Sequence, residues 1–547
     1  MAKKIGDILK ERNLVTDIQL RVAFEHQKIT GELFGDVLVK LGFITSKERS
    51  MIVAEQAGLE FLDLEGYHIP EDALKLIPKA VAERLQFLPL GFEDGKLAIG
   101  VTKAGNIQAV DMVSRITKRQ PKLYLVDPEI FSDTLERSYF LVENPINSRI
   151  EKIVKDVQTA GNPQGDDIVS LVELLILDAI RKKATDIHVT PHQYAINVFY
   201  RIDGVLQHQY CLPRATYSGI VSRIKILSQL DIAETRLPQD GSFTFVFSNK
   251  EHDIRVSFVP TIHGQNLVLR ILAGNISLLR LESLGFSQYV IKILKELFQK
   301  PNGILLITGP TGSGKTTTLY AGLRLINILE RNVITVEDPV EYKLNFIRQS
   351  QVQERIGYDF SSAAKQFLRQ DPDVVLLGEI RDIDSANIAI RASITGHLVL
   401  STLHTNDAVT AIPRLVDLGA DRFLISSSLL AVIAQRLVRT ICPFCKESYK
   451  PTEEERQYLN QYGFESSELW RGKGCPRCNN MGFIGRTAVA EVMVVNEEIK
   501  ELIYEGASVG RLTEAALRNG MVSLVKEGIQ KALEGKTTIS ELRRVLG

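Results

Sequence analysis

Residues 303–320 read Gly-Ile-Leu-Leu-Ile-Thr-Gly-Pro-Thr-Gly-Ser-Gly-Lys-Thr-Thr-Thr-Leu-Tyr, and this stretch decides the fold of the largest part of the chain. Its second half matches the phosphate-binding pattern G-x-x-x-x-G-K-[ST]. The apolar run before the motif predicts a buried strand and the run after it predicts a helix, which is the context the motif requires. The glycines let backbone N–H groups face phosphate oxygens, and the helix N-terminus adds positive potential. The predicted nucleotide-contacting residues are Gly309, Pro310, Thr311, Gly312, Ser313, Gly314, Lys315, Thr316 and Thr317.

Two residues of this loop have separate predicted roles. Lys315 should reach the β- and γ-phosphates of ATP, and the Thr316 hydroxyl should bind Mg²⁺. A P-loop also needs an acidic strand end nearby, for the metal or for the attacking water. The apolar run 374–377, followed by Gly378 and Glu379, supplies one, with Glu where Asp is usual.

Two further segments carry side chains suited to chemistry. Residues 336–341 place three carboxylates around a proline at the end of a predicted strand, Glu341 being the last. Acidic loops are usually solvated surface, but this one follows the P-loop helix, on the side where a carboxylate can orient water. His397 and His404 flank another predicted strand. A lone histidine is usually structural, whereas two beside a nucleotide site favour a role there.

Composition limits the class of protein. The 547 residues suggest three or four domains, and 66 Lys plus Arg balance 66 Asp plus Glu. A nucleic-acid-binding protein usually shows a basic excess, so we expect no nucleic-acid partner. The first residues contain no secretory signal, and no run of about 18 uncharged apolar residues exists. We therefore expect any membrane role to depend on partners.

The chain shows a change of pattern along its length. Residues 5–9 and 14–16 recur imperfectly as 34–38 and 43–45, and each copy predicts a short helix, a turn, an N-cap threonine and a second helix. Strand patterns at 96–101 and 122–126 predict a small α/β unit, and those at 195–200, 242–247 and 266–272 predict a second one. The expected domains are a helical repeat module (1–60), a small α/β domain (61–142), a linker (143–167), a second α/β domain (168–285) and the P-loop domain (286–547) with a cysteine lobe (440–480).

From Gly303 onward, short apolar runs alternate with helical stretches. The runs are 304–308, 333–336, 374–377 and 398–402. Such runs are typical of a parallel sheet with helices on both faces. The fold class is therefore multidomain α/β.

Four of the five cysteines form two C-x-x-C pairs, while Cys211 stands apart. Four thiolates suit a closed, tetrahedral structural zinc site in a reducing compartment. The two pairs are far apart for a minimal zinc ribbon, and a helix predicted at 453–462 accounts for the separation. The predicted zinc ligands are Cys442, Cys445, Cys475 and Cys478.

With these motifs in place, the sequence resembles the secretion ATPase superfamily, which includes type II secretion ATPases and type IV pilus assembly ATPases. Residues 334–342 resemble its Asp box, 371–382 its modified Walker B and 396–406 its His box. Residues 184–189 and 238–241 resemble signature runs of the domain before the motor. The resemblance implies a RecA-like motor domain with a parallel sheet and an inserted tetracysteine zinc lobe. A PAS-like α/β domain and an N-terminal helical plus α/β module would precede it.

The resemblance also implies roles for single residues. Glu379 would act in the modified Walker B, and Glu341 would activate water. His397 and His404 would sense or relay the nucleotide state. Three arginines match family positions directed at nucleotide phosphates, namely Arg255, Arg270 and Arg486.

The family implies a homo-hexameric ring that uses ATP, Mg²⁺ and Zn²⁺. It would be cytoplasmic and peripheral at the inner membrane, acting on a membrane platform protein and bound by a membrane-anchored docking protein. The tetracysteine lobe and the run 423–439 favour type II secretion, with pilus assembly as the alternative. A DNA translocase and a nucleotide-sensing scaffold with little turnover are the rival functions.

The N-terminal repeat resembles a domain that in some relatives binds cyclic di-GMP through two tandem motifs. The spacing fits. Lys4 and Leu33 stand where the family pattern has arginine, and Asn13 stands where the second copy has Gly42. Cyclic di-GMP binding and docking of a membrane-anchored partner both remain open for this module.

Overall fold

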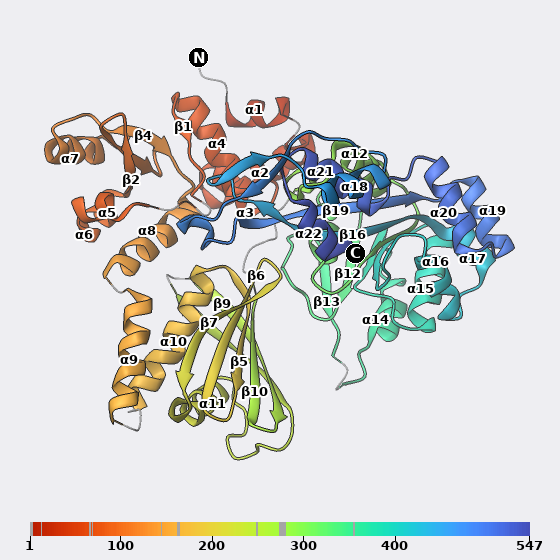
Figure 1. The fold of residues 1–547 in the computed structure, drawn as a ribbon. Coiled ribbons are helices and arrows are strands. Elements are labelled where there is room, and N and C mark those ends of the chain that lie inside the picture. Colours follow the sequence, from red (N-terminus) through yellow and green to blue (C-terminus); the bar gives the residue numbers. More distant parts are fainter. Residues whose placement is uncertain are drawn as a thin grey trace. The chain divides into compact units, whose positions relative to one another are not determined.

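The computed structural model describes residues 4–12, 14–64, 67, 69–143, 145–160, 165–247, 250–272, 280–353 and 356–547. The chain divides into two compact units, residues 1–274 and 275–547. Figure 1 shows the first unit in red to yellow-green and the second in green to blue. Within the described ranges, no helix has both the length and the apolar character needed to cross a membrane.

The first unit contains two sheets and eleven α-helices among its described residues. In chain order its elements are α1 (Ile5–Glu11), α2 (Asp17–Thr30), α3 (Phe34–Lys40), α4 (Ser46–Ala57), β1 (Glu60–Phe61), α5 (Glu71–Leu76), α6 (Lys79–Leu85), β2 (Phe87–Glu93), β3 (Lys96–Val101), α7 (Ile107–Thr117), β4 (Lys122–Leu125), α8 (Pro128–Glu143), α9 (Ile146–Ala160), α10 (Gly165–Arg181), β5 (Ala184–Pro191), β6 (Ala195–Ile202), β7 (Val205–Pro213), α11 (Tyr217–Leu227), β8 (Gln239–Phe247), β9 (Lys250–Thr261) and β10 (Gly264–Ile271).

The sequence repeat at the N-terminus corresponds to two copies of a short helix followed by a longer one. Thr16 caps α2 and Thr45 caps α4, each through a capping box with the third residue of its helix. The predicted helix–turn–N-cap–helix pattern is confirmed. Asn13, which distinguishes the first copy from the second, lies outside the described residues. A four-stranded sheet of order β1-β4-β3-β2 follows.

The segment that we expected to be a linker contains a long helix, α9. Ile146, Ile150 and Val157 recur at helical spacing along it and are buried. Ile146 and Ile150 belong to the core of the following domain. The expected linker therefore contains a docked helix over residues 146–160, because an apolar stripe of a few residues is enough to dock a helix. The rest of the expected linker includes residues 144 and 161–164, which lie outside the described residues.

The second domain of this unit is a six-stranded antiparallel sheet of order β7-β6-β5-β10-β9-β8. Alternate residues of β6, namely Ile196, Val198 and Tyr200, point into the core, which α10 and α11 complete. The sheet therefore has one packed face and one open face (Figure 1). Neighbouring side chains of a strand point to opposite faces of the sheet. Arg255 and Arg270 each lie next to a core residue on their strands, so both point to the open face.

The second unit carries the P-loop. Its elements are α12 (Gln288–Phe298), β11 (Gly303–Thr308), α13 (Lys315–Leu323), β12 (Val333–Glu337), β13 (Arg348–Gln351), α14 (Phe360–Phe367), β14 (Val374–Leu377), α15 (Ile383–Ile394), β15 (Leu398–Leu403), α16 (Ala411–Asp417), α17 (Arg422–Ser428), β16 (Leu429–Ile441), β17 (Lys446–Tyr449), α18 (Glu453–Gln461), β18 (Leu469–Gly472), β19 (Phe483–Val494), α19 (Glu497–Glu505), α20 (Val509–Arg518), α21 (Leu524–Leu533) and α22 (Ile539–Leu546).

A seven-stranded sheet of order β13-β12-β14-β15-β11-β16-β19 forms the centre of this unit. All neighbours pair in parallel except β16 with β19. Ile304 and Leu306 of β11 point into one core, while Leu305 and Ile307 point into the other. Helices α12 and α13 cover the second core, and α14 to α17 lie on the first. The predicted parallel sheet with helices on both faces is confirmed.

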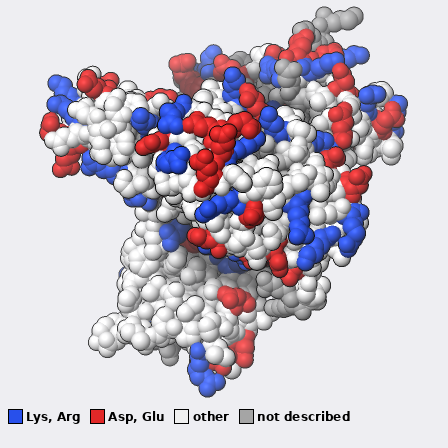
Figure 2. Space-filling model, turned by 90° about the vertical axis from the view of Figure 1, so that its right-hand side faces the viewer, with Lys and Arg blue, Asp and Glu red and all other residues white. Residues whose placement is uncertain are grey.

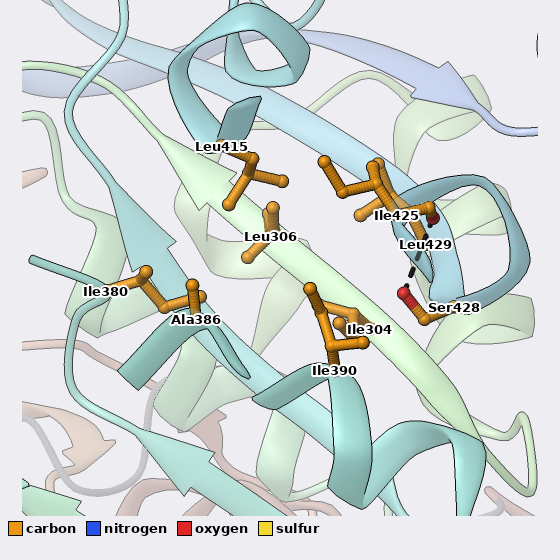
Figure 3. A pocket seen from close by; sticks show the side chains of 9 residues that line it. All are labelled: Ile304, Leu306, Ile380, Ala386, Ile390, Leu415, Ile425, Ser428 and Leu429. Atoms are coloured by element: carbon orange, nitrogen blue, oxygen red, sulfur yellow. Dashed lines mark hydrogen bonds between the residues drawn. The ribbon is translucent and has the colours of Figure 1, made fainter. Parts of the chain in front are cut away.

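The core between β11 and helices α15 to α17 contains one small apolar cavity. Figure 3 shows Ile304 and Leu306 facing Ile390, Leu415 and their neighbours across it. Its volume of about 10 Å³ is no more than one water molecule needs. The cavity is therefore a packing gap and not a ligand site.

The contact between α12 and α13 gives a prediction about stability. A Cβ at Gly322 would lie 2.0 Å from the fully buried ring of Phe298, so the P-loop helix packs on α12 through a position that only glycine fits. We expect Gly322→Ala to destabilise the second unit by about 1–3 kcal/mol, since overpacking forces the ring or the helix to move. The measurement is the urea midpoint of unfolding.

Gly510→Ala is the matched control, because a Cβ there meets nothing closer than 4.0 Å on the exposed surface of α20. Its midpoint should stay at the wild-type value or rise slightly. A Gly322→Ala chain as stable as Gly510→Ala would show that the α12–α13 contact is not close-packed.

Candidate nucleotide site and tetracysteine site

The P-loop connects the end of β11 at Thr308 to the start of α13 at Lys315. Its three glycines have positive φ angles, 147° at Gly309, 79° at Gly312 and 87° at Gly314. A Cβ at Gly309 would lie 2.5 Å from the Gln435 carbonyl oxygen. The loop therefore requires glycine for its backbone angles and, at Gly309, for a close approach of two main chains.

A buried glutamine of β16 supports the loop from below. Gln435 is 1% exposed, and its Nε2 donates to the Ser313 carbonyl at 2.8 Å. Its Oε1 accepts from the Thr318 hydroxyl at 2.8 Å. The sequence analysis did not identify Gln435. The sequence feature that could have indicated Gln435 is that it is a single amide side chain in an apolar run. Parallel pairing places that run beside the P-loop strand.

Lys315 folds back over its own loop. Its Nζ donates to the carbonyl oxygens of Gly309, at 2.9 Å, and Pro310, at 3.2 Å. Burial lowers the pKa of Lys315, and the Glu379 carboxylate opposes that shift. The ammonium group is therefore at the mouth of the loop, within the influence of Glu379.

Glu379 follows β14 and lies between an arginine and a histidine. Its Oε1 pairs with Arg381, and its Oε2 lies 3.3 Å from His404 Nε2. Arg381 also lies 3.9 Å from a carboxylate oxygen of Asp338. The structure thus brings Glu379 and His404 together as predicted residues and adds Arg381, which the sequence analysis did not single out. The sequence feature that could have indicated Arg381 is its position two residues after Glu379, the carboxylate predicted at the end of a strand.

The acidic segment at the end of β12 contains two different kinds of carboxylate. Glu337 is 4% exposed, and its burial raises the pKa of its carboxyl group. Hydrogen bonds from Thr335, Tyr320 and Gln349 oppose this shift only in part. Glu341 is exposed. Strand β12 is separated from β11 by β14 and β15, a distance of about 15 Å. Both carboxylates lie at the same edge of the sheet as the P-loop, because the strands are parallel.

The two histidines that the sequence analysis expected to flank a strand lie at opposite ends of β15. His404 follows the strand at the P-loop edge, whereas His397 precedes it and its carbonyl accepts from Gly303 at the start of β11. The strand separates them by roughly 20 Å. His397 Nδ1 lies 2.7 Å from the Ala392 carbonyl, at the end of α15. The two ends of one strand cannot share one sheet edge, so within one chain His397 lies at the edge opposite to the P-loop, and its expected nucleotide role stays a prediction.

The three predicted arginines lie on two different sheets. Arg255 and Arg270 are directly opposite each other on β9 and β10. Arg270 Nε donates to the buried Asp186 at 3.0 Å. Like charges in opposite positions repel, so this pair is suited to an anion. Arg486 is exposed on β19 and opposite Arg439 of β16, beyond the P-loop edge of the sheet.

The four predicted zinc ligands come together between β16 and β19. All four sulfur atoms lie within 4.8 Å of one another. Sγ–Sγ distances are 3.8 Å for Cys442–Cys475, 3.8 Å for Cys445–Cys478 and 3.7 Å for Cys475–Cys478. A tetrahedron with Zn–S bonds of about 2.3 Å has edges of about 3.8 Å, so the sulfur positions fit zinc. Helix α18 lies between the two pairs, as predicted.

A P-loop at the carboxyl edge of a doubly covered parallel sheet, with Glu379 facing Lys315, defines a P-loop ATPase. A comparison with family models narrows the class further. The model described as "Type II/IV secretion system protein" matches residues 163–544, and the model described as "MshEN domain" matches residues 57–141. The chain belongs to the type II/IV secretion system protein family, and the predicted resemblance is confirmed.

Named relatives agree with this assignment. The "Type IV pilus assembly ATPase PilB" of Myxococcus xanthus is 38% identical, with 99% of this chain and 98% of the relative covered. The "Type II secretion system ATPase E" of Vibrio cholerae is 38% identical, with 86% of this chain and 97% of the relative covered. Among solved structures, the Legionella pneumophila ATPase DotB has a TM-score of 0.50 and 20% identity, covering 68% of this chain and 94% of its own. At 20% identity, this similarity shows that the two proteins share a fold and nothing more.

The position of Gln435 gives a prediction about nucleotide binding. Gln435→Leu would leave the Ser313 carbonyl and the buried Thr318 hydroxyl without this partner, at about 1–3 kcal/mol for each group. We expect the loop to relax and ADP to bind at least about tenfold more weakly. Titration with a fluorescent ADP analogue measures this affinity.

Gln370→Leu is the matched control, since Gln370 is exposed and its segment pairs with Asn332 at the other edge of the sheet. ADP affinity should not change in that variant. Wild-type affinity in Gln435→Leu would contradict a supporting role for the glutamine.

Proposed function

We propose that the protein is a ring-forming motor that couples ATP hydrolysis to type II protein secretion through pseudopilus assembly. The observation that carries the motor function is the group of Lys315, Glu379, Arg381 and His404 at one edge of the parallel sheet. It combines a phosphate-binding cation, Lys315, with a carboxylate, Glu379, that is paired with Arg381 and lies beside His404. Such a site responds electrostatically to the arrival and loss of a phosphate.

The proposed chemistry assigns one role to each of the edge residues. Loop N–H groups and Lys315 bind the β- and γ-phosphates, and the Thr316 hydroxyl is the P-loop ligand for Mg²⁺, which neutralises phosphate charge when bound. Glu341 accepts the proton of the attacking water. It is an exposed carboxylate at this edge, and it matches the carboxylate to which the family resemblance gives this role. His404 stabilises Glu379 and can follow the phosphate's presence through that contact.

We further propose that Arg255, Arg270 and Arg486 supply positive charge to the nucleotide's phosphates. The cross-strand pairing of Arg255 with Arg270 supports this, since a bound anion relieves their repulsion. Arginine suits the role because its planar group can bind two phosphate oxygens at once.

The quaternary state and partners are also proposals. A homo-hexamer satisfies the need for a head-to-tail contact that closes into a ring. We propose that the ring acts in the cytoplasm at the inner membrane, on a platform protein and through a membrane-anchored docking protein. For the helical repeat module at residues 1–60, cyclic di-GMP binding and docking of a membrane-anchored partner are both candidate functions. The match to the "MshEN domain" model covers residues 57–141, which follow the repeat, and so it does not separate the two.

The choice of type II secretion rests on the tetracysteine lobe and on sequence identity. A Pseudomonas aeruginosa relative named "Type II secretion system protein E" is 46% identical over 70% of this chain. Type IV pilus assembly is the second candidate, because the Myxococcus xanthus PilB aligns with nearly the whole chain. Inactivating the gene in its own organism separates the two, since loss of secreted enzymes supports the first and loss of surface pili the second.

A DNA translocase is less well supported. On the face that Figure 2 shows, lysine and arginine side chains are interspersed with acidic ones. Nucleic-acid binding generally needs a basic stripe and weakens with salt. Binding of single-stranded DNA that falls steeply between low and moderate salt would favour this rival.

The proposed roles of Lys315 and Glu341 predict the outcome of a phosphate-release assay. Lys315→Ala and Glu341→Gln should each lower the rate by about a hundredfold or more, because the first loses phosphate binding and the second loses the proton acceptor. The matched controls are Lys300→Ala and Glu330→Gln, which change exposed residues outside the site. Both controls should hydrolyse ATP at the wild-type rate.

Full activity in Glu341→Gln would show that another carboxylate activates water. A wild-type chain that binds ATP and releases no phosphate would instead support the nucleotide-sensing scaffold.

The tetracysteine geometry predicts one bound zinc ion per chain. Replacing Cys475 and Cys478 together with serine should remove the zinc and lower the unfolding temperature, because a structural zinc contributes folding free energy directly. Metal analysis of the purified protein measures the content. Cys211→Ser is the control, since this exposed cysteine lies in the other unit and should not affect the zinc.

Zinc retained at one ion per chain in the double variant would contradict the assignment of these ligands. A metal other than zinc in the wild-type protein would contradict the identity of the ion alone.

A further inference from the structure

We propose that Tyr320, Glu337 and Gln349 are positioning residues that hold the loop bearing Glu341 at a fixed distance from the P-loop helix. The proposal rests on the proposed role of Glu341 in activating water. It assigns the three residues to the geometry of hydrolysis and not to nucleotide binding.

The backbone on both sides of Glu341 is held by glutamine side chains of β13. On one side, the Val340 N–H donates to Gln351 Oε1 at 3.2 Å. On the other side, Gln349 Nε2 donates to the Tyr342 carbonyl at 2.8 Å, and Gln349 Oε1 accepts from the Leu344 N–H at 2.6 Å. The loop that carries an exposed carboxylate is therefore attached to a strand at both ends.

The same glutamine connects this loop to the P-loop helix. Tyr320 lies five residues after Lys315 on α13, and its hydroxyl donates to Glu337 at the end of β12. Gln349 Nε2 lies 3.3 Å from the Tyr320 hydroxyl and 3.3 Å from Glu337 Oε1. The ring of Tyr320 also meets the ring of Tyr342 edge to face, with centroids 5.6 Å apart. A continuous set of contacts thus runs from the helix of Lys315 to the residue next to Glu341.

Glu337 is the centre of this network. Its carboxyl group is 4% exposed and accepts from the Thr335 hydroxyl at 2.6 Å as well as from Tyr320. Burying a carboxylate is costly unless hydrogen bonds compensate, and here three side chains supply them. A carboxylate so enclosed has no face left for water. Glu337 therefore fixes geometry, and the contact with water belongs to an exposed carboxylate of the loop, which is Glu341 in the proposed function.

The consequence is a separation of two properties. Nucleotide affinity depends on the P-loop, which Gln435 supports from β16 on the other side of β11. Hydrolysis depends on the distance between the γ-phosphate and a carboxylate three strands away. A displacement of about 1 Å in a reacting group can lower a rate by about a hundredfold without weakening binding.

Two variants test the proposal in the full-length chain. Gln349→Met keeps the side-chain length and removes the two hydrogen bonds that Gln349 makes to the loop, at Tyr342 and Leu344. Tyr320→Phe keeps the ring against Tyr342 and removes only the hydroxyl. We expect each to lower the single-turnover rate of ATP hydrolysis by about tenfold or more. The KM for ATP and the affinity for a fluorescent ADP analogue should stay within about twofold of wild type.

Gln370→Met is the matched control, since it places methionine at an exposed glutamine outside the network, and it should keep the wild-type rate. If Gln349→Met does not fold, Tyr320→Phe alone decides. Wild-type turnover in Tyr320→Phe would overturn the proposal, and so would an equal loss of rate and of ADP affinity, which indicates general destabilisation.

The proposed function and this inference fail differently. Normal turnover in Gln349→Met and Tyr320→Phe, together with an inactive Glu341→Gln, would overturn the positioning role alone. Normal turnover in Glu341→Gln would overturn the role of Glu341 and the inference with it.

Discussion

The parallel pairing of β11 with β15, of β15 with β14 and of β14 with β12 is the constraint on which the rest of the second unit depends. Parallel strands require a crossover between them, so their carboxyl ends and the loops that follow come to one edge of the sheet. The P-loop, the acidic loop after β12, Glu379 and His404 are far apart in the chain and become neighbours for this reason. The same pairing keeps His397 away from this edge, because a residue that precedes β15 lies at the opposite edge of the sheet.

The pairing brings the loops to the edge, and buried polar side chains then attach them. The Thr308 hydroxyl accepts from the Thr405 N–H at 2.7 Å and so fixes the loop that begins with His404. Gln435 holds the P-loop in the same way, and Glu491 accepts from the Ala408 N–H at 2.9 Å. A sheet covered on both faces offers few polar partners, so each of these groups must bond to the backbone of a loop. Their burial strengthens the contacts by excluding water.

Sequence could predict the parts of this arrangement that are encoded locally. The P-loop, the apolar strands of the sheet and the cysteine pairs each have a pattern within a few residues, and each is found where its pattern placed it. Gln435, Tyr320 and Arg381 have no such pattern, because their significance depends on contacts with residues distant in the chain. Helix α9 was missed for another reason, since its apolar stripe is sparse and is flanked by residues typical of loops.

The hairpin of β16 and β19 connects the nucleotide edge to the tetracysteine lobe. Beyond the P-loop edge, β16 continues to Arg439, whose guanidinium donates to the buried Glu541 of α22 at 2.7 Å. The Thr537 hydroxyl also donates to the Arg439 carbonyl at 2.8 Å. Arg486 stands opposite Arg439, so the C-terminal helices anchor the strand beside it. The cysteine lobe lies at the far end of the same hairpin, where one C-x-x-C pair follows β16 and the other precedes β19. The C-terminal helices and the tetracysteine lobe therefore both contact the hairpin that carries Arg486, so two separate parts of the unit hold the backbone at this arginine.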